Sequence, residues 1–66
     1  MTVKEICRIV QETKIVLFEL KRVFDGHVCE IDPGEPIPEK YADRKVLQLE
    51  SVAEEEDGVI YLIMDN

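Results

Sequence analysis

Residues 59–64 read Val-Ile-Tyr-Leu-Ile-Met, an uninterrupted apolar run. Every side chain in it is apolar or aromatic, and β-branched and aromatic residues favour a strand. Successive side chains of a strand point to opposite faces of its sheet. The odd-numbered and even-numbered residues of the run therefore give the strand two apolar faces. The run predicts a sheet that needs cover on both sides.

A second run of this kind, Ile-Val-Leu-Phe at residues 15–18, lies within a strand that we expect at residues 13–20. After a turn near residues 19–22, we expect a strand at residues 23–30 with a bulge at Gly26. It would pair antiparallel with the strand before it.

The last two strands are expected to form a hairpin. Residues 45–52 would be its first strand and residues 59–64 its second. The acidic stretch Glu-Glu-Glu-Asp-Gly at residues 54–58 would be the connecting loop.

A helix is expected at residues 3–11, ahead of these strands. Thr2 and Glu5 have the spacing of a capping box, in which their side chains satisfy free amides of the first turn. The apolar residues that follow recur at helical spacing and form one stripe: Val3, Ile6, Cys7 and Val10.

All three prolines lie at residues 33–38, so the chain must leave the sheet there, because proline donates no ladder hydrogen bond. Residues 38–43 then suit one helical turn. The expected fold is a single α+β domain of residues 1–66, in the order α-β-β-β-β. Its N-terminal helix would pack on a four-stranded, mainly antiparallel, curled sheet.

One short helix can cover only one face of such a sheet. The other face could be closed by curling into a partial barrel, by the proline connector, or by another protein molecule. We favour the last, either a homodimer or a partner surface, built from four side chains: Val16, Phe18, Tyr61 and Ile63.

The net charge of −7 arises entirely in the second half of the chain. Residues 1–30 hold five acidic and five basic residues, whereas residues 31–66 hold ten acidic and three basic residues. Direct binding of nucleic acid or of an anionic membrane is disfavoured, because such partners are held by Lys and Arg. A basic protein partner fits better.

The acidic residues of the second half are candidates for a partner-binding surface. They are Glu35, Glu39, Glu50, Glu54, Glu55, Glu56 and Asp57. The alternative is that the hairpin tip is only solvated. The tip lacks the alternating oxygen ligands of an EF-hand loop, so calcium is not expected.

No catalytic, cofactor-binding or metal-binding residue is expected, and the chain is not expected to be an enzyme. Cys7 and Cys29 are expected to be reduced thiols. On an extended strand, His27 and Cys29 would project on the same side, but no third group orients them as base and nucleophile. Apolar runs are too short to cross a bilayer and no signal peptide opens the chain, so we expect a cytoplasmic protein.

Five short segments carry a resemblance to known proteins: Met1–Ile6, Val23–Gly26, Ile37–Pro38, Asp43–Val46 and Asp57–Tyr61. In these segments the chain resembles small proteins encoded by phages and mobile elements of Firmicutes. The resemblance implies no enzymatic activity. It implies a role like that of the small acidic anti-defence or anti-CRISPR inhibitors, some of which mimic nucleic acid.

Two functions are therefore expected from different classes. The first is a non-catalytic, acidic inhibitor that binds a basic nucleic-acid-handling protein. The second is a structural or oligomerising module that acts through the apolar sheet face, with its acidic residues serving solubility alone.

Overall fold

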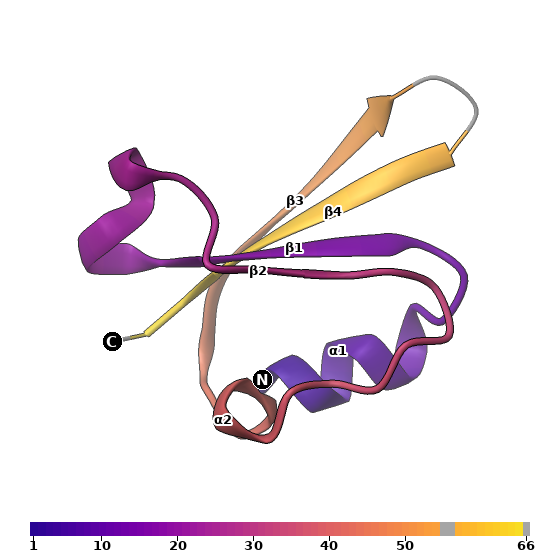
Figure 1. Cartoon of the computed structure of the whole chain (residues 1–66), viewed down its shortest axis with the longest axis horizontal. Helices are drawn as coiled ribbons and strands as arrows, with labels where there is room; N and C mark the ends of the chain where they lie inside the picture. Colours follow the sequence, from indigo (N-terminus) through magenta and orange to yellow (C-terminus); the bar gives the residue numbers. More distant parts are fainter. Residues whose placement is uncertain (55–56, 66) are drawn as a thin grey trace.

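A computed structural model describes residues 1–54 and 57–65 and has an α+β fold (Figure 1). In chain order its elements are α1 (Val3–Ile9), β1 (Lys14–Glu19), the 3-10 helix η1 (Leu20–Asp25), β2 (Cys29–Ile31), α2 (Glu39–Ala42), β3 (Val46–Glu54) and β4 (Asp57–Met64).

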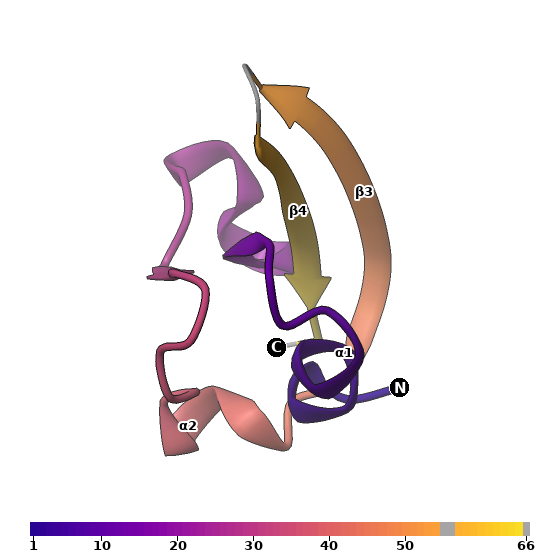
Figure 2. The same ribbon diagram turned by 90° about the vertical axis from the view of Figure 1, so that its right-hand side faces the viewer.

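The four strands form one mixed sheet in the order β2-β1-β4-β3. β1 pairs antiparallel with β2, and β3 pairs antiparallel with β4, whereas β1 and β4 are parallel. The sheet is strongly curved but it does not close (Figure 2). The expected four-stranded, mainly antiparallel α+β fold is confirmed.

The capping box at the start of α1 is formed as expected. The Thr2 N–H donates to Glu5 Oε1 at 3.0 Å, and the Glu5 N–H donates to Thr2 Oγ1 at 3.4 Å. The hydrogen bond from the Thr2 N–H is the main cause that lowers the pKa of Glu5. α1 ends at Ile9, two residues before the expected end.

Replacing Thr2 with alanine is expected to lower the free energy of unfolding by about 0.5–2 kcal/mol, because an amide of the first turn loses its cap. A Thr2→Ser variant should retain most of the stability.

The lowered folded-state pKa of Glu5 makes the stability of the chain depend on pH. The contribution of Glu5 to the free energy of unfolding is present above its unfolded-state pKa and is lost as the pH falls through its folded-state pKa. Chemical denaturation at neutral and acidic pH measures both effects.

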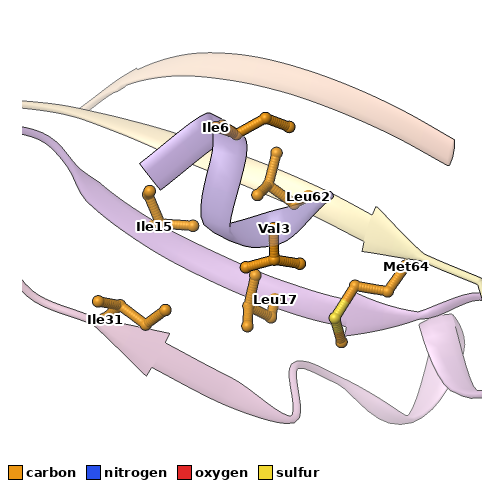
Figure 3. Close-up of a cluster of buried hydrophobic side chains, with 7 residues drawn as sticks. All are labelled: Val3, Ile6, Ile15, Leu17, Ile31, Leu62 and Met64. Carbon is orange, nitrogen blue, oxygen red and sulfur yellow. The ribbon is translucent and has the colours of Figure 1, made fainter. Parts of the chain in front are cut away.

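The main cluster of buried hydrophobic side chains lies on one face of the sheet (Figure 3). Its buried side chains come from α1 and from three strands: Val3, Ile6, Ile15, Leu17, Ile31, Leu62 and Met64. Ile37 of the proline connector and Tyr41 of α2 pack against the same cluster. The connector therefore covers the face that α1 covers, and not the opposite one as considered from the sequence.

The strand expected at residues 23–30 is wrong in its first half. Residues 20–25 form η1, in which the Arg22 and Asp25 side chains approach to 3.9 Å at the (i, i+3) spacing. Gly26 does not form a bulge. It ends η1 with a φ of 106°, a conformation that favours glycine. Strand pairing with β1 resumes only at Cys29.

The predicted hairpin is present with longer strands than expected. β3 continues to Glu54 and β4 begins at Asp57, so part of the predicted loop is strand. Glu55 and Glu56, also assigned to that loop, lie outside the described residues. The helical turn expected at residues 38–43 is confirmed as α2, which an ion pair between Lys4 and Asp43 at 2.7 Å links to α1.

Candidate protein-binding surface

The sheet face opposite α1 carries an apolar stripe, which we call the open face. It consists of Val16 and Phe18 of β1 with Val59, Tyr61 and Ile63 of β4. Val16 lies opposite Tyr61 in the ladder, and Phe18 lies opposite Ile63. The four side chains predicted to form a partner surface are therefore neighbours on one face.

The side chains of the open face contact one another, and among the helices of the described residues only η1 reaches this face, at one end. The Phe18 and Tyr61 rings meet edge to face, with centroids 5.5 Å apart and an angle of 73°. Val16 and Val59 are buried, at 6% and 8% exposure, whereas Phe18, Tyr61 and Ile63 remain half-buried. Val23 of η1 reaches one end of the face and helps line a hollow of about 120 Å³.

η1, whose Val23 reaches the open face, also carries exposed apolar side chains. Phe24 is fully exposed (101%), and Leu20 is half exposed (51%). A fully exposed aromatic side chain gains nothing from burial in its own fold, and aromatic residues are enriched at protein interfaces. The exposure of Phe24 could not be predicted from the sequence, because the residue types at 23–30 favour a strand.

The structure does not gather the predicted acidic residues on one surface. Glu50 borders the open face, where it lies opposite Tyr61 and helps line the hollow. Glu35 accepts a hydrogen bond from the Asp32 N–H at 2.9 Å, and Glu39 begins α2. Figures 1 and 2 place α2 at the end of the molecule opposite the β3–β4 hairpin.

The other predicted acidic residues are at that hairpin. Glu54 and Asp57 pair in the ladder, and Glu55 and Glu56 lie outside the described residues. Within residues 1–54 and 57–65, no basic side chain lies within ion-pair distance of Glu50.

His27 and Cys29 do not project on the same side as expected. His27 precedes β2, and its ring contacts Phe18 of the open face with centroids 6.3 Å apart. Cys29 lies opposite Leu17 and packs against the core on the other face. The two side chains cannot work as base and nucleophile in this arrangement, because the sheet separates them.

Both cysteines are free thiols in surroundings that disfavour the reactive thiolate form. Burial raises the pKa of the Cys7 thiol, and burial is also the main cause that raises the pKa of Cys29. We therefore expect slow reaction of both with a thiol probe at neutral pH, since the thiolate is the nucleophile. Comparing labelling rates of the native and urea-unfolded chain checks this. Rapid native labelling of Cys29 would point to an activated thiol.

A second hollow of about 440 Å³ lies on the opposite side, between α1 and the proline connector. Cys7, Lys4 and Glu35 help line it. In the described part of the chain, no cluster of three metal-ligating side chains is found. The helices described there are all too short or too polar to cross a membrane.

Arg44 has a structural role at the ends of β1 and β4. Its guanidinium donates to Glu19 Oε2 at 3.3 Å, and its Nε and Nη2 donate to the carbonyl of Asp65. It thereby ties the end of β1 to the end of β4. No local sequence signal marks this role, because the partners are 25 and 21 residues away.

Comparison of the chain with protein-family models, with curated proteins and with solved structures finds no match.

Proposed function

We propose that this protein is a non-catalytic protein-binding module that contacts its partner through the open face and Phe24. The observation that carries the proposal is the apolar stripe on the sheet face that α1 leaves uncovered. Burying this stripe against a partner would remove exposed aromatic and aliphatic surface from water, which is the dominant favourable term in association.

The charge of the chain indicates what kind of partner fits. The net charge is −7, and Glu50 stands beside the open face with no described basic side chain near enough to pair with it. A basic protein with an apolar patch would complement both features. A cytoplasmic setting, in which Cys7 and Cys29 stay reduced, is part of the proposal.

A second candidate is an acidic inhibitor of a basic nucleic-acid-binding protein, as in the phage-encoded proteins that the sequence resembles. The ten acidic residues of the second half favour it. The distribution of these residues favours it less, since a nucleic-acid mimic needs its carboxylates along one surface, and Glu39 begins α2, which lies at the end of the molecule opposite the hairpin.

Affinity capture from a bacterial lysate, at low and high salt, separates the two candidates. Ile63→Thr removes apolar surface from the open face and keeps a β-branched side chain, while Ile9→Thr makes the same change on exposed α1. Glu54→Lys with Glu55→Lys reverses two charges at the hairpin, and Glu35→Lys with Glu39→Lys reverses two near α2. Circular dichroism checks that each variant folds.

The proposed function predicts that Ile63→Thr loses the captured partner and Ile9→Thr retains it. If the hairpin reversal alone abolishes capture, and high salt does so too, the acidic inhibitor is the better account. Capture that survives every variant would contradict both.

A further inference from the structure

β3 is a sheet edge that is only partly covered. It has β4 as its single neighbour in the sheet and runs for nine residues at the margin (Figure 2). The first residues of the chain already pair with the start of its outer side. The Val46 N–H donates to the Met1 carbonyl at 2.8 Å, and the Val3 N–H donates to the Arg44 carbonyl at 3.0 Å. This short pairing is antiparallel, at Thr2 and Lys45.

Beyond Val46, no described segment pairs with this outer side. Peptide groups of an antiparallel pair alternate between the partner strand and the outside. The peptide N–H of Val46, which lies opposite Met64, points outward. Beyond the bulge between Val46 and Gln48, the peptide groups that point outward are therefore those of the β3 residues that lie opposite even-numbered residues of β4. These outward residues are Leu49, Ser51 and Ala53.

The side chains along this edge have an unusual composition for an exposed strand. Leu47 and Leu49 are 46% and 48% exposed, and Met1 beside them is 66% exposed. Natural edge strands are commonly blocked by proline or lysine, and residues 46–54 contain neither. Gln48 and Glu50 are exposed on the other side of the strand.

We propose that the outer edge of β3 binds an extended segment of a protein partner as an added antiparallel strand. The segment alternates apolar residues, which meet Leu49, with basic residues, which meet Glu50. A second copy of this chain is a poorer partner for the edge, because each copy has a net charge of −7. Its own β3 edge would also present Glu50 and not a basic side chain. This inference rests on the proposed function only in taking the same basic class of partner.

Amide hydrogen exchange of the ¹⁵N-labelled chain tests this inference with a short acetylated peptide of alternating lysine and valine. In the free protein, the outward amides of Leu49 and Ser51 should exchange fast, while those of Gln48 and Glu50 should be protected by β4. Saturating peptide should slow exchange at Leu49 and Ser51 by about tenfold or more. The same peptide with alternate peptide nitrogens methylated should give no protection, because it lacks the pairing donors.

The matched variants are Glu50→Lys, which should lose peptide binding, and Glu39→Lys, which should keep it. Ile63→Thr should also keep peptide binding. A variant that disrupts the open face is thereby distinguished from one that disrupts the β3 edge. Several outcomes would overturn the inference: equal protection by the methylated peptide, no protection at saturation, or protection of Leu49 that rises with protein concentration alone, which would indicate a second copy.

Discussion

Replacing Leu62 with alanine should largely unfold the chain. Leu62 is fully buried in the centre of the core, between α1 and the sheet. Truncation of a buried leucine costs about 2–5 kcal/mol, from lost burial and from the cavity left behind. A single core in a chain this short supplies only about 3–5 kcal/mol. Urea denaturation followed by circular dichroism gives the loss directly.

The neighbouring residue provides the control. Ile63 follows Leu62 in β4 but points to the open face, where it is only half-buried. Ile63→Ala should therefore cost clearly less than Leu62→Ala, although both remove a branched aliphatic side chain. Equal losses at the two positions would mean that the open face is covered as fully as the core, and the account of a one-sided core would be wrong.

Replacing Phe24 with alanine should leave stability unchanged and weaken partner binding strongly. The side chain is fully exposed at the end of η1, so truncation removes no buried surface from the folded monomer. Exposed aromatic residues that become buried on binding are frequent hot spots, worth about 2 kcal/mol or more, which is roughly 30-fold in Kd. Titration calorimetry with the captured partner measures the change.

Ile9→Ala is the matched control for Phe24→Ala, because Ile9 is 72% exposed on α1 and not on the open face. It should leave both stability and affinity unchanged. If Ile9→Ala weakens binding and Phe24→Ala does not, the partner contacts the helical side of the molecule.

The elements that could be predicted from the sequence are those with a strong local signal. The capping box at Thr2 and Glu5 marks the start of α1, and the run at residues 59–64 marks β4. The side chains of the open face followed from strand alternation alone. Their placement side by side came from the parallel pairing of β1 with β4, which joins segments more than 40 residues apart.

The features that could not be predicted depend on tertiary structure or on a close choice between local conformations. Val23 and Phe24 suit a strand by propensity, yet they lie in η1, which leaves Phe24 exposed and brings Val23 onto the open face. Propensity is overridden here by tertiary context. The division of the acidic residues between two ends of the molecule was equally hidden, because it depends on where the connector packs.

Methyl cross-saturation NMR of the labelled chain bound to its captured partner shows which face of the sheet the partner contacts. Binding through the open face predicts the strongest attenuation at the methyl groups of Ile63 and none at Ile15, Leu17 or Leu62, which lie on the face that α1 covers. Attenuation confined to Ile9 of α1 and Ile37 of the connector, with the open-face methyl groups unaffected, would contradict it.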